Sequence, residues 1–203
     1  MPENLSIYCS TSSGKRTGVV TDLLEYLRGA PELSLFPHKA QATDRMWLQT
    51  TNATNLDATT LESMFQHHEC IWVYFNSAAS DQGAVLGLQS SANVLNCQLS
   101  LPRAWGVILK RSVLVAVTIR LLSIVSGETL VGVSAAYGED GAIAFPRSLA
   151  ECCKSISDSS PLWIAATDIE TVRSCGLFDK LVQRDGKWLC ENTIRLLQSG
   201  LSG

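Results

Sequence analysis

The sequence predicts an α+β protein whose helices pack on a mostly antiparallel central sheet. Between residues 70 and 102, three strand patterns follow one another with turn residues between them, and helix patterns precede and follow them. The chain has 203 residues, 46% of them hydrophobic and 17% charged, so it is long enough to bury a core without metal or disulfides. Because no linker or low-complexity stretch divides it, we expect a single domain over residues 1–203.

The elements expected before residue 70 are one strand and two helices. Leu5–Cys9 has the composition of a strand, and a small polar loop at 10–16 follows it. Thr17–Arg28 predicts a helix because apolar residues recur at helical spacing, at Val19, Val20, Leu23, Leu24 and Leu27. Residues 31–55 contain several breakers and predict an irregular segment, with a short helix near 40–48 as the alternative. A second helix begins after a cap at Asp57, or at Thr59 with Glu62.

The three central strand patterns differ in their side-chain period. Ile71–Phe75 is a continuous apolar run, which is typical of a strand buried on both faces near the middle of a sheet. Residues 84–88 predict a weaker strand, interrupted by Gly87. Residues 95–101 alternate apolar and polar side chains, as a half-buried strand does, and the turn residues at 90–93 make the last two strands an antiparallel hairpin.

The C-terminal half begins with a very apolar stretch, residues 103–126. We interpret it as a core helix and not a membrane span, because Lys110, Arg111 and Arg120 would be costly inside a bilayer. Gly127 is the expected C-cap. The further expected elements are a strand from Thr129, a short helix at 148–156, a strand at 162–166, a turn or short helix at 168–173, a hairpin around Asp185-Gly186, and a closing helix containing Ile194, Leu196 and Leu197.

The charges are distributed unevenly along the chain. The net charge is −3, which argues against a surface devoted to nucleic acid. Residues 137–170 hold six acids against Arg147 and Lys154, a net of −4, and residues 44–69 have a net of −3. The rest of the chain is therefore net positive. This pattern is consistent either with a solvated mixed surface or with an acidic face for a basic partner.

The chain has seven cysteines, with no CxxC pair and no secretory signal, so we expect reduced thiols in the cytoplasm. The densest group of possible metal ligands is His67-His68-Glu69-Cys70. Adjacent residues rarely chelate one ion together, and we expect neither a metal site nor another cofactor.

Two motifs resemble catalytic loops, but their details differ. Residues 10–16 stand between a strand and a helix, where backbone N–H groups can bind a phosphate. A Walker loop would need glycine at Cys9 and Ser or Thr at Arg16, and a phosphatase loop would need arginine one position earlier. Residues 132–136 resemble a nucleophile elbow, yet a turn follows them instead of a helix. We therefore do not expect an enzyme, and keep an anion-binding loop after the first strand as the alternative.

Several strings resemble one known family. They are LSIYCS leading into an amphipathic helix, PELSLF, GAVLGLQSSANVLNCQLSLP ahead of a long helix, and PLWIAATD near the end. Together they span most of the chain, and the chain resembles the immunity protein 52 family of bacterial polymorphic-toxin and type VI secretion systems. That resemblance implies a protein that binds and neutralises a cognate toxin, a nuclease of restriction-endonuclease fold.

Charge clustering, and not the family, suggests which residues would bind such a toxin. An inhibitor with clustered carboxylates can block a cleft built for a polyanion. The candidates are Glu139, Asp140, Glu151 and Asp158, with Trp47 and Trp105 as aromatic anchors. We expect the partner to be a toxin or effector protein, with no nucleic acid and no membrane. A non-toxin adaptor protein is a further alternative.

Overall fold

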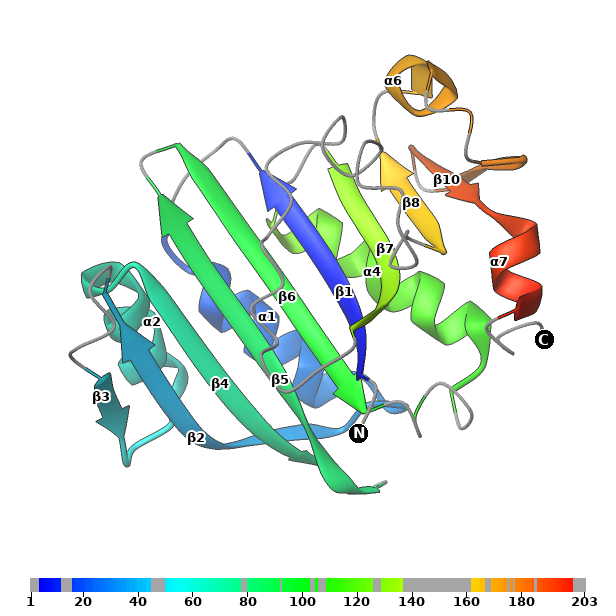
Figure 1. Ribbon diagram of the computed structural model, residues 1–203. Helices are drawn as coiled ribbons and strands as arrows, with labels where there is room; N and C mark the ends of the chain where they lie inside the picture. Colours follow the sequence, from blue (N-terminus) through cyan, green and yellow to red (C-terminus); the bar gives the residue numbers. More distant parts are fainter. Residues whose placement is uncertain are drawn as a thin grey trace.

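The protein is built on one large antiparallel sheet with most of its helices on one side (Figure 1). The computed structural model describes residues 4–11, 16–44, 50–77, 80–91, 93–102, 105, 109–125, 129–136, 162–166, 169–174, 176, 178–184 and 186–198. The sheet has ten strands in the order β3-β2-β4-β5-β6-β1-β7-β8-β10-β9, and every neighbouring pair is antiparallel. The structure confirms the predicted α+β class.

The strands are β1 (Asn4–Thr11), β2 (Leu35–Thr43), β3 (Thr50–Ala53), β4 (Cys70–Ser77), β5 (Ser80–Ser91), β6 (Val94–Pro102), β7 (Thr129–Ala136), β8 (Trp163–Ala166), β9 (Lys180–Arg184) and β10 (Lys187–Glu191). The helices are α1 (Val19–Gly29), α2 (Ala58–His67), α4 (Arg111–Val125), α6 (Ile169–Ser174) and α7 (Thr193–Gln198). Figure 1 shows α1, α2 and α4 on the same side of the sheet, which we call the helix face; the opposite side is the distal face.

The main core lies between the helix face and these three helices. The stripe predicted for α1 is buried, and Leu23 and Leu27 at its centre are completely inaccessible to solvent. Alternate residues of β6 point to the same core: Leu95, Cys97 and Leu99 are inaccessible as well. Burial of these aliphatic side chains provides the main force that holds the helices on the sheet.

The predicted hairpin of β5 and β6 is confirmed, but the burial of β4 differs from the prediction. In β4, Ile71, Val73 and Phe75 are buried, whereas Trp72 and Tyr74 are only half-buried. The strand is therefore not buried on both faces. Trp72 and Tyr74 point to the distal face and therefore do not pack against α1, α2 and α4.

The prediction that residues 31–55 are irregular is wrong for residues 35–43 and 50–53, and the alternative of a helix near 40–48 is wrong for residues 40–43 as well. Residues 35–43 form β2, which pairs with β4, and residues 50–53 form the edge strand β3. A register shift between Pro37 and Lys39 accommodates the proline without a ladder hydrogen bond. The residues of β2 that face the core after this shift are only Ala40 and Ala42, which give a weak hydrophobic pattern.

The helix expected over 103–126 is interrupted. Trp105 is helical, Leu109 and Lys110 are not, and α4 begins at Arg111. Among the residues that the structure describes, no helix is long and apolar enough to cross a membrane. The expected cap Gly127 and the expected helix at 148–156 lie outside the described residues.

The C-terminal end of the sheet has a small second core. The predicted hairpin is confirmed as β9 and β10, with Gly186 at φ +73° in its turn. The second core contains Ile164, Ala166, Val172 and Cys190, and packs β8 and β10 against α6. On the other side of the same strands, the buried carboxylate of Glu191 forms ion pairs with two cations, Arg111 of α4 and Lys180 of β9, and thereby links the hairpin to α4.

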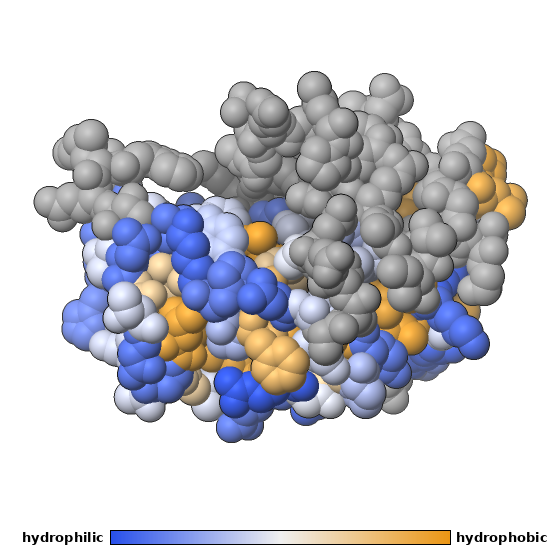
Figure 2. Space-filling view, turned by 90° about the horizontal axis from the view of Figure 1, so that it is seen from below, coloured by the Kyte–Doolittle hydropathy of each residue, from blue (hydrophilic) through white to orange (hydrophobic). Residues whose placement is uncertain are grey.

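Figure 2 views the molecule from below Figure 1, and the coloured atoms are a mixture of hydrophilic and apolar groups without one large apolar patch. Among the described residues, the exposed large hydrophobic side chains are Phe36, Ile194 and Leu197, with 48%, 66% and 68% of their surface accessible. Two of these lie on α7, at one end of the sheet.

Candidate functional site

Of the six residues expected to contact a partner, the structure describes one. Trp105 has only 2% of its surface accessible and belongs to the main core, so its ring cannot serve as an exposed aromatic anchor. Its apolar indole is better accommodated between the sheet and the helices than in water. Glu139, Asp140, Glu151, Asp158 and Trp47 lie outside the described residues.

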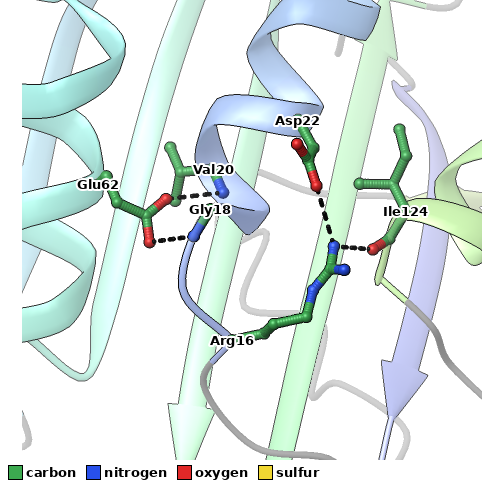
Figure 3. A network of polar contacts seen from close by, with 6 residues as sticks. All are labelled: Arg16, Gly18, Val20, Asp22, Glu62 and Ile124. Carbon is green, nitrogen blue, oxygen red and sulfur yellow. Dashed lines mark hydrogen bonds and ion pairs between the residues drawn. The ribbon is translucent and has the colours of Figure 1, made fainter.

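The N-terminus of α1, where an anion-binding loop would place a phosphate, holds an internal carboxylate instead (Figure 3). Glu62 of α2 accepts hydrogen bonds from the backbone N–H groups of Gly18, at 3.0 Å, and Val20, at 3.1 Å. Gly18 has φ +85°, which glycine tolerates and which turns its N–H toward α2. The carboxylate thus takes the position that a bound anion would occupy at a helix N-terminus.

Arg16, two residues before Gly18, is also engaged. Its guanidinium donates to the carboxylate of Asp22 at 3.2 Å and to the carbonyl oxygen of Ile124 at the end of α4 (Figure 3). The arginine therefore joins the first turn of α1 to the C-terminus of α4, whose unpaired carbonyls favour a positive charge. Residues 12–15 of the loop lie outside the described residues.

The four described cysteines are free thiols. Burial raises the pKa of Cys97 from 9.0 to about 12 and that of Cys70 to about 11. Burial also raises the pKa of Cys9 well above its usual value, and that of Cys190 to about 11. These thiols are protonated at neutral pH, and a protonated thiol is a poor nucleophile and a poor metal ligand.

The His67-His68 pair and the elbow-like stretch at 132–136 both have contacts that differ from those of a functional site. The ring of His67 bonds the carbonyl of Ser63, and that of His68 lies 3.2 Å from the carboxylate of Asp44. Ser134 lies inside β7 and pairs with Ser6 of β1, so it does not stand at a strand-to-helix turn as an elbow serine does. Within the described part of the chain, no group of three His, Cys, Asp or Glu side chains could hold a metal ion.

The distal face of the sheet carries polar and aromatic residues in regular rows. Three successive rows of paired residues cross β1, β6, β5, β4 and β2: Ser10, Asn96, Gln89, Cys70 and Thr43; Tyr8, Gln98, Gly87, Trp72 and Gln41; Ser6, Ser100, Val85, Tyr74 and Lys39. Only Lys39 in these rows carries a formal charge. The rows combine aromatic rings with amides and hydroxyls. We call the part of them on three strands, together with Asn52 of β3, the Trp72 platform; its members are Lys39, Gln41 and Thr43 of β2, Cys70, Trp72 and Tyr74 of β4, and Val85, Gly87 and Gln89 of β5.

Trp72 lies across its neighbour on β5. A Cβ atom placed on Gly87 would lie 2.4 Å from Cζ3 of the Trp72 ring, so the ring covers the glycine directly. The two residues are a cross-strand pair, and only glycine leaves room for the indole to lie this close to the backbone. The ring therefore lies along the sheet.

The polar side chains beside Trp72 form a hydrogen-bonded chain. The hydroxyl of Tyr74 donates to Oε1 of Gln41 at 2.9 Å, and Nε2 of Gln41 donates to Oδ1 of Asn52 on the edge strand at 3.2 Å. The ammonium of Lys39 lies 5.1 Å from the centre of the Tyr74 ring, which is a cation–π distance. Partial burial raises the pKa of Tyr74 above its usual value, so its hydroxyl remains a donor at neutral pH.

Toward the centre of the sheet, the distal face holds buried polar groups. Gln98 donates through Nε2 to Oγ of Ser100 at 2.9 Å and to Oγ of Ser6 at 3.4 Å. Asn96 and Gln98 are 8% and 4% accessible, so the polar positions of β6 are buried as well as the apolar ones. The predicted half-buried strand is thus buried on both faces.

Trp72 and Tyr74 were not among the residues predicted to contact a partner, and the structure leaves both half-buried on the distal face. The signal was the alternation of two amphipathic aromatic residues with Ile71 and Val73, since tryptophan and tyrosine combine an apolar body with a polar group. Phe75 continues the run and hides this period.

Comparison of this chain with protein-family models, with curated proteins and with solved structures gives no match.

Proposed function

We propose that this chain is an immunity protein, which binds a cognate bacterial toxin and neutralises it by occluding the active site of the toxin. The resemblance described above suggests this class, and one observation carries the binding hypothesis. The Trp72 platform is poor in charge and rich in aromatic and amide groups. Depletion of charge together with enrichment in tryptophan and tyrosine distinguishes the centre of protein interfaces from the rest of protein surfaces.

The chemistry of a nuclease explains how such a protein would inhibit it. A nuclease binds a polyanion, so its cleft is basic, and clustered carboxylates attract that cleft and exclude the substrate. The acidic segment at 137–170 has a net charge of −4 and contains Glu139, Asp140, Glu151 and Asp158. We propose these four carboxylates as the groups that face the cleft.

The free thiols support a cytoplasmic location within the proposal. Cys9, Cys70, Cys97 and Cys190 are unpaired cysteines, which persist in a reducing compartment. A toxin that cleaves nucleic acid acts in the same compartment, so the inhibitor and its target would meet there.

The enzyme alternative has less support from the geometry. An anion bound at the N-terminus of α1 would compete for the N–H groups of Gly18 and Val20, and Glu62 already accepts hydrogen bonds from both. The adaptor alternative shares the same binding surface and differs only in the partner, so a single experiment separates it from the immunity hypothesis.

That experiment is a native pull-down from the bacterium that makes this chain, followed by identification of the partners held in stoichiometric amount. We expect one basic protein with nuclease activity, and we expect that the addition of purified chain abolishes this activity. Recovery of a stoichiometric partner without toxic activity would favour an adaptor. A recovered nuclease that remains active in the complex would contradict inhibition.

A further inference from the structure

We infer that Trp72 is the anchor of the toxin-binding surface, and that the Trp72 platform docks an uncharged, hydrogen-bonding part of the toxin. This inference rests on the proposed function and adds to it the contact surface and the chemistry of the partner. It also assigns to binding a region distant in sequence from the acidic segment.

The first argument is the position of the ring. The indole lies along the sheet on Gly87, so one side of it packs on the backbone while the residue as a whole remains half-buried. A tryptophan held in this way presents the accessible part of its ring at low cost in side-chain entropy, because the glycine pair already restricts its rotamer. Tryptophan and tyrosine are also the residues most often found at the energetic centre of interfaces.

The second argument is preorganisation of the polar groups around the ring. Tyr74, Gln41 and Asn52 are joined by two hydrogen bonds, of 2.9 and 3.2 Å, across β4, β2 and β3. These side chains are therefore already ordered before a partner arrives. Gln41 retains the second lone pair of Oε1, and Asn52 is exposed, so both can bond a partner without breaking the existing chain.

The third argument concerns the chemistry of the partner. Lys39, placed over the Tyr74 ring, is the single formal charge in the three rows. A cationic group of the partner docked on Trp72 would lose water and find no opposite charge in these rows, and an anionic group would find only Lys39, which already lies over the Tyr74 ring. Complementarity therefore requires an aliphatic or aromatic side chain over the indole, surrounded by backbone or amide groups that bond Gln41 and Asn52.

Two surfaces would then divide the work of binding. The acidic segment would set the association rate, which depends on salt because steering acts over distance. The Trp72 platform would set the dissociation rate, which depends little on salt because the contacts there are uncharged. Mutations in the two regions should therefore change different rate constants.

The test measures binding kinetics of the full chain with the toxin recovered by pull-down. We expect Trp72→Ala to raise the dissociation rate by about 30-fold, which corresponds to a hot-spot loss of about 2 kcal/mol. The factor should be the same at low and high ionic strength, and Trp72→Phe should be intermediate. Gly87→Ala, which retains the tryptophan but places a methyl group against its ring, should also raise the dissociation rate. The matched control is Leu197→Ala, which removes an exposed apolar side chain of α7 and should leave both rates unchanged.

A second measurement on the unmodified chain keeps the inference testable if a variant fails to fold. Hydroxyl-radical footprinting should show that toxin binding protects Trp72 and Tyr74 and leaves Leu197 reactive. Unchanged labelling of Trp72 in the complex, or an unchanged dissociation rate for folded Trp72→Ala, would overturn the inference while the immunity function stands. If no toxin is recovered at all, the proposed function itself fails.

Discussion

Removal of the Glu62 carboxylate should destabilise the fold at the junction of α1 and α2. The substitution Glu62→Ala deletes the acceptor for the N–H groups of Gly18 and Val20, at 3.0 and 3.1 Å. Helix caps and hydrogen bonds to charged groups each contribute about 1 to 2 kcal/mol when partly buried, so the pair should contribute about 2 to 3 kcal/mol. Unfolding entropy of about 2.1 cal/mol/K per residue over the 203-residue chain converts this loss to a fall in Tm of about 5 to 7 °C.

The assay is thermal and urea unfolding followed by circular dichroism. Gln66→Ala is the matched control, because it removes the exposed hydrogen bond from Nε2 of Gln66 to Oε1 of Glu62, 2.9 Å long, and retains both bonds from α1 to Glu62. We expect the control to stay within about 0.5 kcal/mol of the wild type. Glu62→Gln retains one acceptor oxygen, so it should lower the free energy of unfolding by about half as much as Glu62→Ala does.

The same variant tests what the carboxylate replaces. With Glu62 removed, the two N–H groups at the N-terminus of α1 become free, and sulfate at high concentration should recover part of the lost stability. Sodium chloride at equal ionic strength should not. If Glu62→Ala unfolds with the free energy and Tm of the wild type, the carboxylate does not cap α1 and the reasoning fails.

Three further outcomes follow from the structure and the proposal. Burial raises the pKa of Cys97 from 9.0 to about 12, so the thiol loses its proton at lower pH in the unfolded chain than in the folded one, and the free energy of unfolding should fall above pH 9 by up to about 1.4 kcal/mol per pH unit. In Cys97→Ala this slope should be smaller by that amount, and equal slopes in the two proteins would argue against a buried thiol. The buried hydroxyl of Thr118 accepts a hydrogen bond from Nε1 of Trp163 at 3.2 Å, so Thr118→Val should cost about 1 to 3 kcal/mol in urea unfolding, while Thr118→Ser, which retains the hydroxyl, should cost less. Reversal of Glu139 and Asp140 to lysine should slow association with the toxin, most strongly at low ionic strength, and an unchanged rate at low salt would contradict an acidic contact face.

Side-chain period predicted the elements that pack against one layer. The apolar stripe predicted α1 and the apolar–polar alternation predicted β6, because one side of each element faces the main core. The Asp-Gly pair predicted the turn at Gly186, because this pair favours the positive φ that the hairpin needs. The strand β2 was not predicted, because its core-facing residues after the bulge are alanines and Pro37 is typical of a strand breaker.

The contacts of Glu62 and of Gly87 could not be predicted from the sequence, because each joins two elements that are distant along the chain. Two caps were predicted as alternatives for α2, and the structure confirms Asp57, which accepts a 2.7 Å hydrogen bond from the N–H of Thr60. Glu62, which belonged to the other alternative, reaches α1 instead. That role depends on how α1 and α2 pack, which no short window of sequence encodes. Gly87 was read as a break in a strand, and its reason, the indole of Trp72 above it, lies on another strand.

The central position of β1 has a consequence for how the protein folds. This first strand pairs with β6 and β7, so Asn4 must meet Pro102 and Ala136, which are made roughly a hundred residues later. At synthesis rates of about 5 to 20 residues per second, β1 waits on the order of 5 to 20 s with both of its edges unpaired. The hairpins of β4, β5 and β6 close over short loops and can form first, after which β1 inserts beside β6. Refolding should therefore be slow for a chain of this size, and β1 is the segment most exposed to mispairing until β6 and β7 are complete.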